Sequence, residues 1–198
     1  EYLKEAGMNV VHFDGVIPNP TTDVVSAGAA MAKEIRADVV IGLGGGSSMD
    51  TAKAIAVEAT HEGTAWDYLF FKKEPTTKTL PIIAISTTSG TGSQATPCAV
   101  ITKSDENNKS AIWHSNIFAK VAIVDPELML TLPKSISAQT GFDAFAHSIE
   151  AYISNGTNPY VESLAVDAIK LIVEYLPRVL KDGTDMEARE AMAWADTL

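Results

Sequence analysis

Residues 37–50, with the sequence ADVVIGLGGGSSMD, decide the fold. Residues 37–43 are nearly all apolar, which is typical of a strand buried on both faces of a parallel sheet. Three glycines, Gly44 to Gly46, follow directly. Beyond them Ala52, Ile55, Ala56 and Ala59 recur at helical spacing. The stretch therefore predicts a buried strand, a tight glycine turn and a helix.

The flanking segments extend this order of elements. Residues 9–13 form a short β-branched run that predicts a strand, and residues 24–35 carry apolar side chains at helical spacing, with Asn19 or Thr21 as the cap. Residues 81–86 (PIIAIS) repeat the buried-strand pattern. Residues 99–102 and 121–124 predict further strands, with a polar loop over 103–109 between them. Strands that alternate with helices predict an α/β fold with a parallel sheet.

The pattern changes after Pro133. No strand pattern follows, and helices are expected at about 137–154, 160–176 and 185–198, with Pro177 ending the second. We therefore expect an α/β domain over residues 1–133 and the beginning of an all-helical domain over 134–198. Residues 1–7 are typical of the last turns of a helix with Gly7 as its C′ residue, and no stop signal follows the final helix. Both domains are therefore expected to be truncated.

Composition and charge exclude several classes of partner. The chain has 198 residues, of which 46% are hydrophobic, and its formal net charge of −10 argues against nucleic acid or an anionic membrane surface as a partner. No apolar run approaches the ~20 residues that span a membrane. Cys98 is the only cysteine, so no internal disulfide forms and a reducing, cytoplasmic location is expected.

The glycine turn is a candidate anion site. Free N–H groups and the positive end of the helix dipole meet where the strand gives way to the helix, and they suit a phosphate. Gly45 and Gly46 let the backbone approach a ligand, and Ser47 and Ser48 add hydroxyl donors. A P-loop is excluded because no Gly-Lys-Ser/Thr follows, and the G-x-G-x-x-G spacing is not met. The alternative is a tight connection without a ligand.

A second small-residue turn follows the next buried strand. Residues 86–93 (STTSGTGS) offer hydroxyl groups and backbone donors together. Because the carboxyl ends of neighbouring parallel strands converge on one crevice, the two turns together predict a dinucleotide site. Lys109 is positioned in the sequence to neutralise a phosphate or contact a ribose. Alternatives remain: residues 86–93 as a solvated Ser/Thr loop, and Lys109 as one surface lysine among several.

Asp143 and His147 are four residues apart in a predicted helix, so they lie one above the other. A carboxylate and an imidazole at this spacing can chelate one divalent cation. The alternative is an ordinary charged pair that contributes about 0.2–0.5 kcal/mol. The other histidines, His12, His61 and His114, are isolated in the sequence and are expected to be structural or solvent-facing.

Taken in order, these segments resemble the iron-containing (group III, metal-dependent) alcohol dehydrogenase family. The resemblance runs nearly end to end, and its segments occur in the family's order and spacing. They are residues 18–21 (PNPT), 44–50 (GGGSSMD), 87–93 (TTSGTGS), 124–128 (VDPEL) and 140–150 (TGFDAFAHSIE). One departure is Gln94, which stands where many members have Glu.

The resemblance implies a Rossmann-like domain that binds NAD or NADP, followed by a helical domain, with catalytic Fe²⁺ (Zn²⁺ in some members) between them. Asp143 and His147 match the first two metal ligands, and two further histidines would lie beyond Leu198. The acidic residue that helps to discriminate NAD from NADP would lie before Glu1. The implied cofactor residues are Asn19, Gly45, Gly46, Ser47, Ser48 and Asp50 at the pyrophosphate, Thr87, Thr88 and Thr91 at the adenine and ribose, and Val100, Lys109 and Leu128 at the nicotinamide half.

The activity that the resemblance implies is an oxidoreductase that interconverts small alcohols with aldehydes or ketones by metal-assisted hydride transfer, in a homo-oligomer. Two alternatives stay open. One is a glycerol-dehydrogenase-like or dehydroquinate-synthase-like enzyme on the same fold. The other is a catalytically incomplete fragment that only binds a dinucleotide or a partner.

Overall fold

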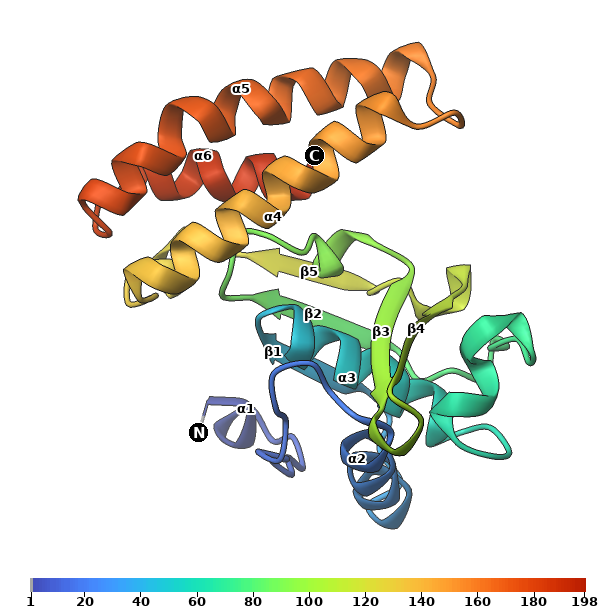
Figure 1. Cartoon of the computed structure of the whole chain (residues 1–198). Helices are drawn as coiled ribbons and strands as arrows, with labels where there is room; N and C mark the ends of the chain where they lie inside the picture. Colours follow the sequence, from blue (N-terminus) through green and yellow to red (C-terminus); the bar gives the residue numbers. More distant parts are fainter. Residues whose placement is uncertain (1) are drawn as a thin grey trace.

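The computed structural model describes residues 2–198, so the part of the expected first helix at Glu1 lies outside the described residues. The chain forms an α/β part followed by three long helices that lie on one side of it (Figure 1). The fold class expected from the sequence is confirmed. The helix α1 (Tyr2–Glu5) ends before Gly7, whose φ of 82° is the left-handed conformation of a C′ glycine.

The central sheet contains three parallel strands in the order β1 (Val40–Gly44), β2 (Ile82–Ser86) and β5 (Val121–Val124). Two of the predicted strands fit this sheet closely, because β2 and β5 coincide with the apolar runs at 81–86 and 121–124. The strands run parallel, so their carboxyl ends share one edge of the sheet. The turns that follow β1, β2 and β5 therefore all start from that edge of the central sheet.

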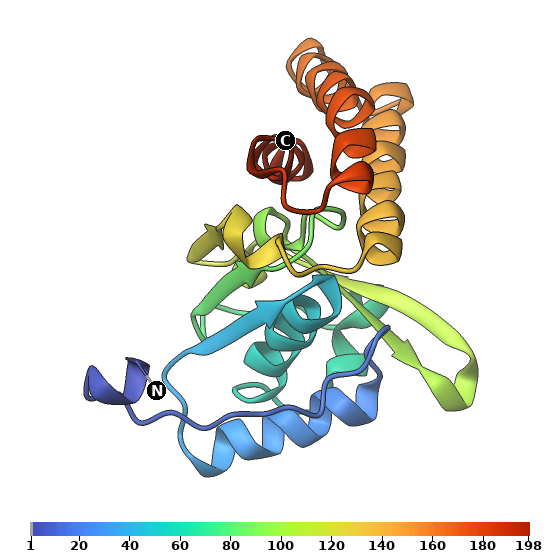
Figure 2. The same cartoon turned by 90° about the vertical axis from the view of Figure 1, so that its left-hand side faces the viewer.

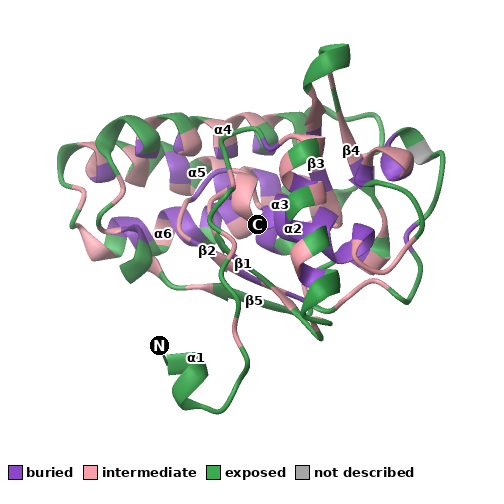
Figure 3. Ribbon diagram, turned by 90° about the horizontal axis from the view of Figure 1, so that it is seen from below, coloured by how far each residue is buried: buried purple, intermediate pink, exposed green. Residues whose placement is uncertain are grey.

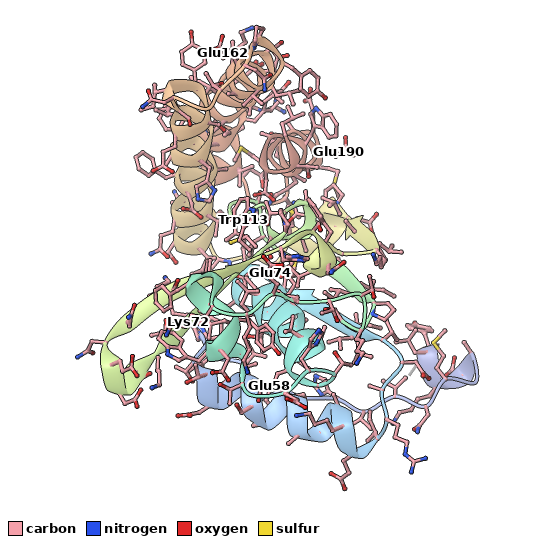
Figure 4. The ribbon with its side chains drawn as sticks, turned by 90° about the vertical axis from the view of Figure 1, so that its right-hand side faces the viewer. Glu58, Lys72, Glu74, Trp113, Glu162 and Glu190 are labelled. Carbon is pink, nitrogen blue, oxygen red and sulfur yellow. The ribbon has the colours of Figure 1, made fainter. Side chains whose placement is uncertain are left out.

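One face of the sheet is covered by α3 (Gly46–Glu58), and α2 (Thr22–Glu34) packs on α3. The helix α3 is buried on nearly all sides, with residues 51–58 all buried. The other helix, α2, is capped by Thr21, whose side chain accepts from the Val24 N–H. Of the two caps expected from the sequence, Asn19 and Thr21, the structure uses Thr21. At the end of α3, the Glu58 carboxylate (labelled in Figure 4) accepts from the Ala65 N–H at 2.6 Å.

The opposite face of the sheet is apolar and open. In register, Ile41 lies beside Ile83 in the neighbouring strand, and Leu43 lies beside Ile85. Leu43 is 59% exposed and Ile123 is 42% exposed. Parallel sheets are almost always covered on both faces, so this apolar surface is unusual for a folded chain (Figure 3, the green parts of β1 and β5).

The polar loop expected over 103–109 is the tip of a β-hairpin and is shorter than predicted. The strands β3 (Cys98–Lys103) and β4 (Asn108–Trp113) pair antiparallel and are joined through the short 3₁₀ turn η3 (Ser104–Glu106). Lys109 therefore lies in a strand opposite Thr102. The polar connection is therefore confirmed only over residues 104–107, and the prediction missed β4 because that strand begins with the polar residues Asn108, Lys109 and Ser110.

Three helices follow: α4 (Lys134–Ile153), α5 (Pro159–Lys181) and α6 (Met186–Thr197). Figure 2 shows α4 and α5 side by side, with α6 packed mainly against α5. The expected end of α5 at Pro177 was wrong, because Pro177 lies inside the helix. The carbonyl that loses its hydrogen bond belongs to Val173, which is 61% exposed, so water can solvate it.

The predicted strand at residues 9–13 was also wrong. This segment is extended, but it has no ladder partner, and only Thr21 forms an isolated bridge with Thr102 further along. A β-branched run becomes a strand only where a neighbouring strand offers hydrogen bonds. The remaining short 3₁₀ helices are η1 (Ala65–Phe71), η2 (Ser93–Ala95), η4 (Ser115–Ile117) and η5 (Pro126–Met129). Within residues 2–198, no helix is long and apolar enough to cross a membrane.

Candidate functional site

The first glycine turn joins β1 to α3 at the carboxyl edge of the sheet. Gly44 has a φ of 142°, which an L side chain rarely adopts, and Gly45 is the N-cap of α3 without a side-chain hydrogen bond to the helix. The first N–H groups of α3 therefore have no side-chain cap. Together with the positive end of the helix dipole, they provide donors for an anion.

The structure brings the second small-residue turn directly against the first. The Thr87 N–H donates to the Gly44 carbonyl oxygen at 3.0 Å. A Cβ atom at Gly46 would lie 2.5 Å from Thr91 Cγ2 and 2.7 Å from Thr91 Oγ1, so any larger residue there would force Thr91 to move. A Cβ at Gly45 would lie 3.1 Å from Thr88. The two turns therefore form one continuous surface of glycine backbone and threonine side chains.

A polar cluster borders the N-terminus of α3. The Asn19 N–H donates to Ser47 Oγ at 3.2 Å, and Asn19 Oδ1 accepts from Lys109 Nζ at 2.9 Å. Asn19 has a φ of 54°, a conformation that asparagine tolerates better than most residues. Because the hairpin carries Lys109 back to residue 19, the structure places a cation beside the free N–H groups of the helix. Ser48 Oγ lies over Gly44 on the other side of the turn.

Asp50 uses its carboxylate within the protein. One oxygen accepts from Ser93 Oγ at 2.7 Å, and the other accepts from the Val100 N–H at 3.0 Å. Burial raises the pKa of Asp50, while these hydrogen bonds and the charges of Lys53 and Lys109 act in the opposite direction. Val100 is thereby fixed in β3, behind the turn surface. Leu128 lies in η5, just past the carboxyl end of β5, and is 42% exposed.

The Asp143–His147 pair lies on α4 near the second turn. Gly90 packs on α4 so closely that a Cβ there would lie 2.6 Å from Thr140 Cβ, one helical turn before Asp143. Asp143 Oδ1 and His147 Nε2 are 3.7 Å apart, and the side chains are 45% and 53% exposed. Both side chains are therefore open to a further ligand.

These two side chains fit a divalent cation in type, since a carboxylate oxygen and an imidazole nitrogen are common metal ligands. The set is incomplete in the part of the chain that the structure describes, where no group of three or more His, Cys, Asp or Glu side chains could hold a metal ion. His147 lines a hollow together with Gly90, Thr91 and Asp196. His147 and the second turn therefore border the same space.

Two features of this region were missed by the sequence reasoning. Lys53 is fully buried beneath the second turn, and its place between the small apolar residues Ala52 and Ala54 was a usable signal. Asp196 of α6 is also buried. Its carboxylate accepts from the Gly92 N–H at 2.9 Å and from Gln94 Nε2 at 2.8 Å. Burial raises the pKa of Asp196, and Gln94 acts against this shift.

Comparisons with known proteins place this arrangement in context. The family profile described as iron-containing alcohol dehydrogenase matches residues 1–126. The profile described as Fe-containing alcohol dehydrogenase family, C-terminal, matches residues 137–198. Together the two profiles cover nearly the whole chain, and the gap between them, residues 127–136, contains the start of α4.

Named relatives agree with the profiles. The chain is 43% identical over 195 residues to the NAD-dependent methanol dehydrogenase of Bacillus methanolicus, covering 98% of this chain and 50% of that protein. An archaeal halo-thermophilic alcohol dehydrogenase from a Red Sea brine pool has a TM-score of 0.96 and 44% identity, covering 99% of this chain and 51% of that one. The sulfoacetaldehyde reductase of Bifidobacterium kashiwanohense, solved with NAD⁺, has a TM-score of 0.90 and 38% identity, covering 96% and 50%. The chain thus spans about half the length of the relatives it matches.

Proposed function

This chain belongs to the iron-containing alcohol dehydrogenase family, and we propose that it carries the dinucleotide site and half of the metal site of an enzyme that interconverts alcohols with aldehydes or ketones. The observation that carries the proposal is the close contact between the two turns, with Gly46 against Thr91 and Gly90 against Thr140. These contacts join the anion-binding surface to the helix that bears Asp143 and His147.

We assign the pyrophosphate to the uncapped start of α3. Gly45, Gly46 and Ser47 offer backbone N–H groups there, and the short side chains leave room for phosphate oxygens. Lys109, held by Asn19 at 2.9 Å, supplies a nearby positive charge in a chain whose net charge is −10. This local cation matters because the whole-molecule field repels an anionic cofactor.

The rest of the cofactor is assigned along the same surface. Thr87, Thr88 and Thr91 would contact the adenine and ribose, while Val100 and Leu128 would border the nicotinamide half with Lys109. A bound nicotinamide accepts or donates a hydride, and the protein's task is to orient its ring against the substrate. Two observations support this direction: Thr88 packs on Gly45 at the turn, and Asp50 of α3 accepts from the Val100 N–H of the hairpin.

Asp143 and His147 would hold a divalent cation, Fe²⁺ or Zn²⁺. When bound, such a cation polarises a substrate oxygen as a Lewis acid. The contact of Gly90 with Thr140 fixes α4 against the second turn. Asp143 and His147, one and two helical turns further along α4, would therefore hold the cation near that turn. We place the boundary between the dinucleotide-binding and helical parts at residues 133–134, on the basis of the change from strands to helices.

A second candidate function is binding without turnover. It is favoured by the lack of a third metal-ligating side chain near Asp143 and His147 within residues 2–198. Two ligands hold a cation weakly, so the chain by itself would bind a dinucleotide and release metal readily. On this view, the choice between NAD and NADP, the choice of alcohol and the assembly into an oligomer would be decided in a longer protein of the kind that its relatives represent.

Titration of the chain separates these functions. We expect NADH to bind, as measured by its fluorescence, and Zn²⁺ to bind weakly, as measured by calorimetry. His147→Ala should weaken Zn²⁺ binding by at least about tenfold and leave NADH binding unchanged. His12→Ala, at an exposed histidine far from the pair in sequence, is the matched control.

The outcomes are distinct. If NADH does not bind to the folded chain, the proposed dinucleotide site is wrong. If Zn²⁺ binds equally well to His147→Ala, the proposed metal pair is wrong. Turnover of a simple alcohol by the chain itself would reject the binding-only alternative.

A further inference from the structure

Lys53 is a buried ammonium group with an unusual set of partners. Its side chain is fully buried in the middle of α3. Lys53 Nζ donates to the carbonyl oxygens of Ser93 at 2.6 Å, Thr96 at 2.9 Å and Cys98 at 2.8 Å, and to Ser93 Oγ at 2.9 Å. An ammonium has three N–H donors, so all of them are used within one short segment of backbone.

That segment connects the second turn to the hairpin. Residues 93–98 leave the turn that carries Thr87, Thr88 and Thr91, and they enter β3, which carries Val100. Three carbonyl groups within six residues of this segment, those of Ser93, Thr96 and Cys98, point at one amine, an arrangement that needs a central cation. Without it, buried carbonyl oxygens would lack donors, at a cost in free energy that proteins avoid.

Asp50 holds the same segment from one helical turn earlier. Its carboxylate accepts from Ser93 Oγ and from the Val100 N–H. Asp50 and Lys53 lie three residues apart on α3, the helix whose N-terminus forms the first turn. The N-terminus of α3 therefore lies at the proposed cofactor site, and the side chains of Asp50 and Lys53 on the same helix hold the second turn in place.

The charges around Lys53 are few. The charged and titratable groups that face this network are Asp50 on the same helix, Cys98 on β3, and Lys109 on β4, which acts on Asp50. Burial lowers the pKa of Lys53 to about 8, while Asp50 and Cys98 act in the opposite direction. A methionine would fill a similar space without the cost of removing a charge from water. The stabilising contribution of Lys53 must therefore come from its hydrogen bonds.

We infer that Asp50 and Lys53 are positioning residues of the dinucleotide site, which shape residues 93–100 and so hold the second turn against the first. The inference rests on the proposed function above. It gives Asp50 a place behind the site rather than a direct contact with the cofactor. When Lys53 loses its proton, the amine keeps two donors and turns a lone pair toward carbonyl oxygens, so the segment loosens.

The test combines NADH affinity with hydrogen exchange. We expect NADH affinity of the chain to be constant near neutral pH and to fall above about pH 8. Lys53→Met should lower the affinity at neutral pH by roughly tenfold and remove that alkaline fall. Asp50→Asn should move the fall to lower pH, because the anion that favours the ammonium is lost. Lys78→Met, at an exposed lysine, is the control and should match the wild type.

Hydrogen exchange reports on the segment without any cofactor. In Lys53→Met we expect faster exchange over residues 93–100, with unchanged exchange in α5. A folded Lys53→Met variant with wild-type exchange over 93–100 overturns the inference, whether or not NADH binds. If Lys53→Met does not fold, the wild type and Asp50→Asn decide the test. The inference is overturned if the NADH affinity of the wild type stays constant past pH 8, or if the pH dependence of Asp50→Asn is the same as that of the wild type. Failure of the wild type to bind NADH counts against the proposed function instead.

Discussion

Replacement of Gly46 by alanine tests the contact between the two turns. The added Cβ would lie 2.5 Å from Thr91 Cγ2. Nonpolar carbon atoms normally approach to about 3.5–4.0 Å, so Thr91 must move by roughly 1 Å. Overpacking of this kind costs about 1–3 kcal/mol, and the loss of backbone freedom in the unfolded chain returns about 0.4–1 kcal/mol. We therefore expect a net destabilisation of about 1 kcal/mol in Gly46→Ala.

The effect on NADH binding should be larger than the effect on stability. A shift of roughly 1 Å opens the joint between the turns where the phosphates are assigned, and we expect a loss of about tenfold in affinity. Urea unfolding gives the stability, and NADH fluorescence gives the affinity. Circular dichroism confirms that each variant keeps its helices.

A double-mutant cycle identifies the cause. Thr91→Ala removes the two atoms that Gly46→Ala would strike, at 2.5 and 2.7 Å, and leaves Cβ at 2.9 Å. The double variant should therefore recover about 1 kcal/mol relative to the sum of the single changes. Additive effects, or wild-type stability and affinity in Gly46→Ala, would refute the packing of Gly46 on Thr91.

Two further predictions concern the rest of the molecule. Asp196→Ala leaves the buried donors of Gly92 and Gln94 without their acceptor, so it should lower the free energy of unfolding by roughly 3 kcal/mol; a loss below about 1 kcal/mol would contradict the described hydrogen bonds. Leu43→Ser and Ile123→Ser, on the open sheet face, should reduce the fluorescence of a bound hydrophobic dye with little change in stability. Unchanged dye binding in both variants would show that this face is covered in solution.

Much of the fold follows from local sequence patterns. The runs at 81–86 and 121–124 are nearly all apolar, the pattern typical of parallel strands, so they predict β2 and β5 closely even though one face of the sheet is open in this chain. Residues 9–13 have a similar composition and form no strand, because pairing depends on a neighbour that the local sequence does not encode. The extension of α5 beyond Pro177 depends likewise on tertiary context, namely the exposure of Val173.

The candidate site likewise contains residues that the local sequence predicts and residues that it does not. Residues 44–50 and 86–93 could be found because glycine and hydroxyl residues follow buried strands, and the neighbouring positions of β1 and β2 then bring the turns together. The link between Asp50 and Val100 spans 50 residues and carries no local pattern. Lys53 could have been found, since it interrupts the apolar stretch of residues 52–57 (AKAIAV), where a lysine is expected to be buried with partners.

The central claim is that the joined turns bind a dinucleotide at the start of α3. The most direct measurement is an NMR titration of the ¹⁵N-labelled chain with NADH, followed by amide chemical shifts. The account predicts the largest shifts at Gly45, Gly46, Thr88 and Lys109, with α5 unaffected. The absence of shifts at these amides, or shifts confined to the apolar groove between Phe142 and Leu176, would contradict it.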